Sequence, residues 1–137
     1  MSPEDLARLH AAAMAPERPW SAPEFASLLG SPGALLLGDG RAVLLGRVVA
    51  DEAEVLTLAT HPGHRRRGLA AALLDRFHAE ARARGAAMAF LEVAEDNAPA
   101  RALYAGAGYR EAGRRPRYYA RAGKPAVAAL ILSRPLR

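Results

Sequence analysis

The chain contains no cysteine, and this absence excludes several kinds of functional site. Without thiols there is no disulfide framework, no thiolate zinc site and no cysteine nucleophile. The chain has four histidines, His10, His61, His64 and His78, and they lack the spacing of metal ligands. We therefore expect neither a metal nor a cysteine thiol of the chain in the chemistry of this protein.

Long apolar runs are also absent. No stretch approaches the roughly 20 residues that span a bilayer. The N-terminal segment carries acids at Glu4 and Asp5 and lacks the apolar core of a signal peptide. Apolar residues make up 51% and charged residues 24% of the 137 residues, which is typical of a globular protein. We expect one cytoplasmic domain, residues 1–137, without membrane contact and either monomeric or weakly dimeric.

Lysine is almost absent, so the positive charge of the chain comes from arginine. The chain has 19 basic and 14 acidic residues, a net charge of +5, and Lys124 is its only lysine. A basic chain suits nucleic acid. These arginines, however, neither line one long helix nor alternate with stacking aromatic residues. Nucleic acid is therefore not an expected partner, although a non-catalytic basic module that binds RNA or ribosomes remains an alternative.

Hydrophobic periodicity and turn residues predict helices, strands and their order. The expected elements are helices 2–14 and 20–30, strands 34–37, 42–49 and 54–60, helix 68–84, strand 87–93, helix 97–108, and strands 109–119 and 126–132. The strand–helix–strand unit of residues 54–93 implies two parallel, neighbouring strands. The fold class is therefore α/β (α+β), with a mixed, mostly antiparallel central sheet and helices on both faces. Ligands of such sheets bind at the carboxyl ends of the parallel strands.

Three consecutive arginines, Arg65, Arg66 and Arg67, lie between strand 54–60 and helix 68–84. The first N–H groups of a helix lack partners, and the helix dipole is positive there. Three arginines disfavour the helix start unless an anion neutralises them, and Gly68 allows a phosphate to approach the backbone. The pattern therefore favours an anion site, although a solvated run of charge is a common alternative. His61 and His64 are expected near this anion, and His10 and His78 on helix surfaces.

The stretch TLATHPGHRRRGLAAALLDRFHAEARARG, residues 57–85, resembles the acetyl-CoA-binding segment of the GNAT N-acetyltransferases. Their signature, Arg/Gln-x-x-Gly-x-Gly/Ala, is present as Arg65-x-x-Gly68-x-Ala70, whereas the glycine patterns of dinucleotide-binding and P-loop proteins are absent. The resemblance implies that Leu58, Ala59 and Thr60 bind the pantetheine and polarise the thioester carbonyl. It implies that the pyrophosphate is held by the backbone amides of Arg66, Arg67, Gly68, Leu69, Ala70 and Ala71, after Arg65.

The second half of the chain resembles the RimI-type branch of this family, which acetylates the N-terminal alanine of a ribosomal protein. The matching residues are Pro19-Trp20-Ser21, Leu91-Glu92-Val93, Asn97, Ala102-Leu103-Tyr104 and Gly108-Tyr109. The resemblance implies that Glu92 is the base for the acceptor ammonium, directly or through a water, and that Tyr104 protonates the CoA thiolate. A solvated carboxylate is a weak base, so we expect Glu92 to be buried. A phenol, with an ordinary pKa of about 10, suits a thiolate leaving group.

The remaining residues of the expected site have alternative interpretations. Asn97 is a helix cap that also faces the pantetheine, seven residues before Tyr104 and on the same helix face. Trp20 is either a core anchor or part of the acceptor pocket. Tyr118 and Tyr119 resemble paired tyrosines that line the acceptor groove, although strand tyrosines without such a role fit nearly as well.

Two departures from the branch put the ribosomal acceptor in doubt. The usual edge strand before the first helix is missing, and Lys124-Pro125-Ala126 replaces an acidic pair in the last hairpin. Arginines at 114, 115, 117 and 121 would repel a basic peptide, whereas Glu92, Glu95 and Asp96 would attract one. The hypotheses are an acetyltransferase for a protein N-terminus, the same chemistry on a small amine, and the non-catalytic basic module.

Overall fold

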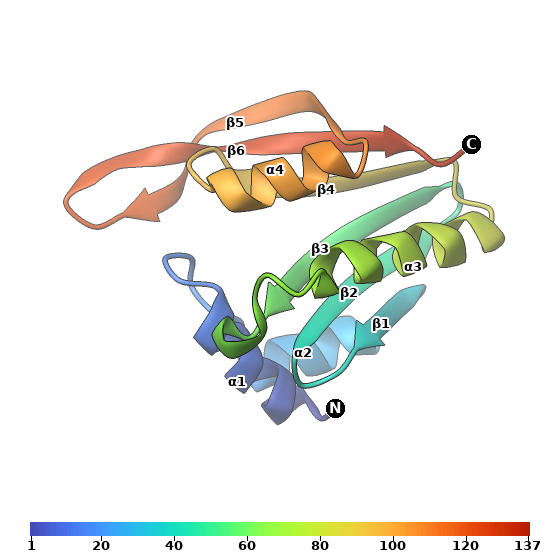
Figure 1. Ribbon diagram of the computed structural model, residues 1–137, viewed down its shortest axis with the longest axis horizontal. Helices are drawn as coiled ribbons and strands as arrows, with labels where there is room; N and C mark the ends of the chain where they lie inside the picture. Colours follow the sequence, from blue (N-terminus) through green and yellow to red (C-terminus); the bar gives the residue numbers. More distant parts are fainter.

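Six strands form one mixed sheet with two helices on each face in the computed structural model, which describes residues 1–137 (Figure 1). The elements in chain order are α1 (Pro3–Ala13), α2 (Ala22–Leu29), β1 (Ala34–Gly38), β2 (Ala42–Val49), β3 (Glu52–Thr60), a 3-10 turn (Pro62–His64), α3 (Leu69–Ala83), β4 (Met88–Ala94), α4 (Ala98–Gly106), β5 (Arg110–Arg121) and β6 (Lys124–Pro135). The predicted order and fold class are confirmed. The last two strands are longer than expected.

Serine side chains cap the starts of the first two helices. The side chain of Ser2 accepts a hydrogen bond from the Asp5 backbone N–H at 3.1 Å, and the Asp5 carboxylate accepts one from the Ser2 N–H. Ser21 and Glu24 form the same reciprocal pair of hydrogen bonds, a capping box, at the start of α2. Each capping box satisfies backbone N–H donors that would otherwise be unpaired at a helix start. None of the helices is both long and apolar enough to cross a membrane, not even the 15-residue α3.

The strands lie in the order β1-β2-β3-β4-β6-β5, and only β3 and β4 are parallel. The expected crossover through α3 is therefore confirmed. The parallel pairing is short, however, because it joins only Glu52–Glu54 to Met88–Phe90. Beyond these residues the two strands separate. As expected, the described residues contain no strand before α1, and β1 forms the sheet edge.

A β-bulge in β3 lies just after the parallel pairing ends. Val55 faces Gly46 of β2 and Thr57 faces Leu45, so Leu56 is the extra residue. A bulge bends its strand and increases the local twist. Because of the extra residue, odd-numbered side chains of β3 point to opposite faces of the sheet before and after the bulge. Val55 packs in the core cluster under α3, whereas Ala59 packs in the cluster under α1. The regular alternation of side chains predicted for strand 54–60 therefore does not hold across the bulge.

The core is divided into two clusters by the sheet. The larger cluster lies under α3 and α4 and includes Phe77 and Leu74, whereas the smaller lies under α1 and α2 and includes Leu6 and Phe25. All four side chains are almost fully buried.

The expectation that His10 and His78 lie on helix surfaces is wrong, because each is only 2% exposed. His10 follows Leu6 by four residues, and His78 follows Leu74 by four. Residues four apart share a helix face, so both imidazoles extend an apolar stripe into the core. His78 bonds the Tyr109 hydroxyl through Nε2 at 2.7 Å and also contacts Arg134.

Candidate functional site

The separation of β3 from β4 leaves backbone groups of both strands without a strand partner on their facing edges. On its other side β3 remains paired with β2 as far as Thr60. The predicted residues Leu58, Ala59 and Thr60 lie on this unpaired stretch, with Ala59 buried and the other two half-buried. Backbone N–H and C=O groups require partners. This edge therefore fits an extended ligand with amide groups of its own, which can bond to it as an added strand.

The loop between β3 and α3 has a backbone suited to an anion. We call residues 61–68 the arginine loop. Arg66 and Gly68 both have positive φ angles, 63° and 73°. Gly68 is the N-cap of α3 and supplies no side-chain cap, so the first N–H groups of the helix are not capped by that residue. No atom lies within 4 Å of the position a Cβ would take at Gly68. The predicted amides of Leu69, Ala70 and Ala71 follow in the first turn of α3.

The three arginine side chains of this loop do not act as one cluster. Arg65 donates from Nη2 to the carbonyl of Ala13 at 3.2 Å, at the last residue of α1. Arg67 donates from Nη1 to Nδ1 of His64 at 2.9 Å. Arg65 therefore ties the loop to α1, a contact that the sequence did not predict.

Glu92 lies on β4, in the part of the strand that has separated from β3. Its side chain is 30% exposed, and Oε1 lies 3.0 Å from Nη2 of Arg115 on β5. The carboxylate is therefore half-buried and paired with a cation, where the sequence predicted full burial.

Tyr104 points from α4 into the core and is 8% exposed. Its ring meets Tyr109 edge-on at 5.8 Å between centroids. Burial, and then the neighbouring Tyr119, raise the pKa of Tyr104 to about 12. The phenol is therefore fully protonated near neutral pH but is a weaker acid than the free side chain assumed from the sequence. Asn97 caps α4, since its Oδ1 accepts from the Ala100 N–H at 3.2 Å.

Tyr119 links the two candidate catalytic groups electrostatically. Burial, followed by the charges of Glu92 and Glu17, raises its pKa to about 12. It also contributes to the raised pKa of Tyr104. Tyr118 meets Tyr119 edge-on at 5.1 Å and is 53% exposed. Arg115 pairs with Glu92 and lies 5.4 Å over the centre of the Tyr118 ring, so the structure brings predicted residues of β4 and β5 together.

A buried arginine that the sequence did not single out for a structural role joins three segments beside this group. Arg121, with a side chain only 8% exposed, donates from Nε and Nη2 to the two carboxylate oxygens of Asp96 at 2.8 and 2.7 Å. The same Nη2 lies 2.7 Å from Oε1 of Glu17, in the connection between α1 and α2. No spacing in the sequence connects these three residues, so only the fold reveals the contact.

Trp20 packs on the face of the sheet that α1 and α2 cover. Its ring stacks on His10 at 5.0 Å between centroids, and its backbone N–H donates to His10 Nδ1 at 2.9 Å. Because Nδ1 accepts, the neutral ring carries its proton on Nε2, which donates to the Thr57 hydroxyl at 3.1 Å. Trp20 also packs against the smaller core cluster. These contacts favour the core-anchor interpretation and connect the α1–α2 segment to β3.

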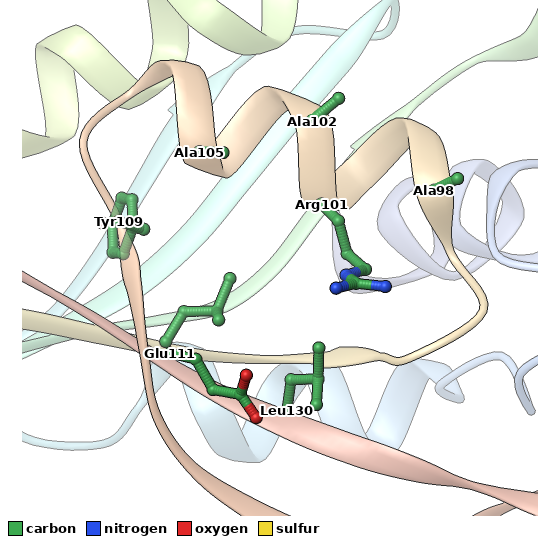
Figure 2. Close-up of a pocket in the computed structure, with 8 residues that line it drawn as sticks. Ala98, Arg101, Ala102, Ala105, Tyr109, Glu111 and Leu130 are labelled. Carbon is green, nitrogen blue, oxygen red and sulfur yellow. The ribbon is translucent and has the colours of Figure 1, made fainter.

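A pocket of about 400 Å³ lies between α4 and the last two strands (Figure 2). Arg101 of α4 and Glu111 of β5 reach toward this space in Figure 2. Its lining residues are Ala98, Arg101, Ala102, Ala105, Tyr109, Glu111, Leu130 and Leu132. None of the residues predicted for the functional site lines it. The pocket meets the site only through Tyr109, whose ring packs on Tyr104.

Comparison with known proteins gives matches over most of the chain. Residues 8–109 match the acetyltransferase (GNAT) family. The [ribosomal protein bS18]-alanine N-acetyltransferase of Escherichia coli K12 is 40% identical over 105 residues, which cover 74% of this chain and 71% of that protein. The N-alpha-acetyltransferase RimI of Mycobacterium tuberculosis is 33% identical over 129 residues, or 88% of this chain and 80% of that protein. The crystal structure of the Escherichia coli ribosomal-protein-S18-alanine N-acetyltransferase superposes with a TM-score of 0.88 at 34% identity, covering 98% of this chain and 87% of that one.

Proposed function

Since the chain belongs to the GNAT acetyltransferase family, and is thus an acetyl-CoA-dependent N-acetyltransferase, we propose that its acceptor is the N-terminal α-amine of a ribosomal protein, on alanine. The observation that carries this proposal is the 40% identity to an enzyme named for that acceptor, over 74% of the chain. Residues 1–137 act as one catalytic domain in this proposal.

The two strands that separate and the arginine loop hold acetyl-CoA. The unpaired edge of β3 at Leu58, Ala59 and Thr60 bonds the amides of the pantetheine arm, and a backbone N–H there polarises the thioester carbonyl. The N–H groups of residues 66–71 bind the pyrophosphate, helped by the positive end of the α3 dipole. Arg66 and Arg67 contribute charge from the exposed loop, and Asn97 contributes from the start of α4.

Transfer occurs directly between the two bound substrates. Glu92 takes a proton from the acceptor ammonium, directly or through a water that reaches its half-buried carboxylate. The neutral amine attacks the thioester carbon, the carbon–sulfur bond breaks, and Tyr104 gives its proton to the departing thiolate. The second proton of the attacking nitrogen then passes through water to the Tyr104 phenolate, which leaves a neutral amide. The raised pKa of Tyr104 supports this role in one respect, because the phenol is protonated at neutral pH. Tyr118 and Tyr119 contact the acceptor, whereas Trp20 anchors the α1–α2 segment through His10.

Replacing either catalytic group tests this assignment. We expect Glu92→Gln and Tyr104→Phe each to lower kcat by tenfold or more, because each variant keeps the shape of the side chain and removes its proton transfer. The measurement is thiol release from acetyl-CoA with peptides that begin with alanine, and with a panel of polyamines, aminoglycosides and amino acids. Glu80→Gln on α3, whose exposed carboxylate pairs with Arg84, is the matched control and should retain full activity.

Two results would contradict the proposal in different ways. Unchanged turnover in both variants, with acetyl-CoA still binding, removes Glu92 and Tyr104 from the chemistry. Faster turnover of a small amine than of any peptide removes the protein acceptor and favours the small-amine alternative.

A substitution at the start of α3 tests the cofactor loop separately. At Gly68 the φ of 73° strains any other residue by about 1–2 kcal/mol, but open space around the site leaves the fold intact. We expect Gly68→Ala to raise the Kd of acetyl-CoA by roughly tenfold, because a methyl group then stands where the phosphate approaches the backbone. Isothermal titration with acetyl-CoA measures this, with Gly40→Ala as the control. Equal affinities in the two variants would place the pyrophosphate elsewhere.

A further inference from the structure

The hairpin of β5 and β6 extends past the end of β4, as Figure 1 shows. Ala94 is the last residue of β4 that pairs with β6, opposite Ala129. Beyond this point β5 and β6 form a ladder only with each other, as far as Arg121 and Lys124. We call residues 116–127 the hairpin tip. Because no neighbouring strand holds the tip, its position depends on side-chain contacts with other segments.

Irregular pairing within the hairpin affects the two tyrosines of the tip. Between the pairs Arg115–Ala129 and Tyr119–Val127, β5 contains two more residues than β6. Extra residues of this kind bend a strand and change the direction of its side chains. The placement of Tyr118 and Tyr119, the proposed acceptor contacts, therefore depends on how the tip is held.

Arg121 makes all the ion pairs that join the hairpin tip to other segments. Its Nη2 lies 2.7 Å from Oδ1 of Asp96, just before α4, and 2.7 Å from Oε1 of Glu17, in the α1–α2 connection. Its Nε donates to the second carboxylate oxygen of Asp96 at 2.8 Å. Within the tip, its guanidinium carbon stands 5.8 Å over the centre of the Tyr119 ring. Three segments therefore meet at one buried guanidinium.

The two carboxylates depend on this guanidinium to different degrees. Asp96 accepts hydrogen bonds on both oxygens, a bidentate geometry that fixes its position. Glu17 has one contact with Arg121, and its buried Oε1 has no hydrogen-bond partner, so the charge of Arg121 is its compensation. A buried carboxylate without its cation is costly, and it repels a second carboxylate beside it. Loss of Arg121 should therefore release Glu17 from the tip.

The two ends of the α1–α2 connection are fixed without Arg121. At the first end Arg65 of the arginine loop donates to the carbonyl of Ala13, and at the second end Trp20 packs against the smaller core cluster. Between these ends, the pair of Glu17 with Arg121 is the ion pair that reaches across to the hairpin tip. Breaking it should move the middle of the connection and leave the contact with the cofactor loop in place.

We propose that Arg121 is a positioning residue for the acceptor, which holds the α1–α2 connection and the hairpin tip together beside the carboxyl end of β4. It takes no part in proton transfer. The segments that it holds form the walls against which the acceptor binds, so its loss weakens acceptor binding more than the chemical step. This proposal rests on the proposed function, in which Tyr118 and Tyr119 contact the acceptor.

The variant Arg121→Gln tests this role in the full chain, with a peptide that begins with alanine. We expect the KM of the peptide to rise about tenfold, because peptide binding must then order the two segments that Arg121 holds. At saturating acetyl-CoA, kcat should change by less than about threefold. The Kd of acetyl-CoA, measured by titration, should stay the same. Arg121→Lys should restore part of the affinity, since it keeps the charge but not the planar fork.

The variant Glu17→Ala isolates the contact with the α1–α2 connection, because it leaves the bond between Arg121 and Asp96 in place. It should raise the KM of the peptide by about fivefold. Added to Arg121→Gln it should raise KM no further, since both changes remove the same contact. Arg82→Gln is the matched control. Arg82 also joins distant segments, through a 2.7 Å hydrogen bond from Nε to the carbonyl of Leu136, and its loss should leave KM unchanged.

The outcomes separate this inference from the proposed function. An unchanged KM in Glu17→Ala, effects that multiply in the double variant, or an equal rise of KM in Arg82→Gln overturns the role of Arg121 while leaving acetyl transfer to peptides intact. An equal loss of acetyl-CoA affinity or of kcat overturns it too, because the effect then reflects the whole fold. No acetylation of any peptide by the unmodified protein overturns both. Circular dichroism and thermal unfolding show whether each variant is folded, and Glu17→Ala decides alone if Arg121→Gln is not.

Discussion

Lowering the pH from 7 to 5 should destabilise the folded chain by roughly 2 kcal/mol for each of two buried histidines. Burial, opposed by the charge of Glu24 and assisted by that of Arg18, lowers the pKa of His10 from 6.5 to about 4. Burial, followed by the charges of Arg134 and Arg82, lowers the pKa of His78 to about 4 as well, against Asp75. A loss of about 4 kcal/mol is a large part of the stability of an ordinary domain.

The sign of this pH effect on stability follows from proton uptake on unfolding. Between pH 6.5 and 4 the unfolded chain binds a proton at each of these histidines and the folded chain does not, so acid favours the unfolded state. The stability is complete above pH 6.5 and is lost as the pH falls toward 4. Hydrogen bonds from arginine and the backbone lower the pKa values of carboxylates such as Asp39 and Glu24 to about 2. Protonation of these groups therefore reduces the stability only at lower pH, below about 4. The interval from 6.5 to 4.5 therefore reports chiefly on the histidines.

The hydrogen bonds of the two rings explain why they resist protonation. Nδ1 of His10 accepts from the Trp20 backbone, and Nδ1 of His78 accepts from Arg134. A proton on either nitrogen turns an acceptor into a donor that faces another donor, so the bond is lost inside the core.

Urea unfolding at pH 7, 6 and 5 measures this effect. We expect the free energy of unfolding to fall steadily, and the decline to be about halved in His10→Gln or His78→Gln even if these variants are less stable at pH 7. His64→Gln in the exposed arginine loop should retain the full decline. Equal stability at pH 7 and pH 5 in the unmodified protein would contradict the prediction.

Adding one methyl group at Gly46 should destabilise the fold by about 3 kcal/mol. Gly46 lies on β2 beside the bulge in β3, where α3 crosses the sheet. A Cβ here would stand 2.3 Å from Cε1 and 2.8 Å from Cζ of Phe77, and 2.9 Å from the Glu54 carbonyl oxygen. Phe77 is fully buried and has little room to move.

The Gly46→Ala variant should therefore unfold at lower denaturant concentration, with the slope of the transition unchanged. Gly40→Ala is the control, because nothing lies within 4 Å of its Cβ position; its stability should change by no more than about 0.5 kcal/mol. Phe77→Leu removes the two clashing ring carbons, so in the double variant the added cost of Gly46→Ala should shrink. If the two substitutions add independently, the clash with Phe77 is not the cause.

Local patterns in the sequence determined the elements and the position of the arginine loop. Ser2 and Ser21 begin their helices by interactions within one turn, and the apolar stripe of α3 requires only residues three and four apart. The crossover through α3 then made β3 and β4 parallel neighbours, and the signature at Arg65, Gly68 and Ala70 indicated the cofactor.

Only the tertiary structure decided how the charges and buried groups are arranged. Arg115 reaches Glu92, and Arg121 reaches Glu17 and Asp96, across separations of 23 to 104 residues in the chain, which no periodicity records. The bulge at Leu56 depends on the register with β2. Burial of His10, His78 and Tyr104 depends on what packs over each side chain, and this burial sets their pKa values. The sequence by itself therefore determined the order of elements and the family, whereas the environment of each candidate group was decided by contacts between distant segments.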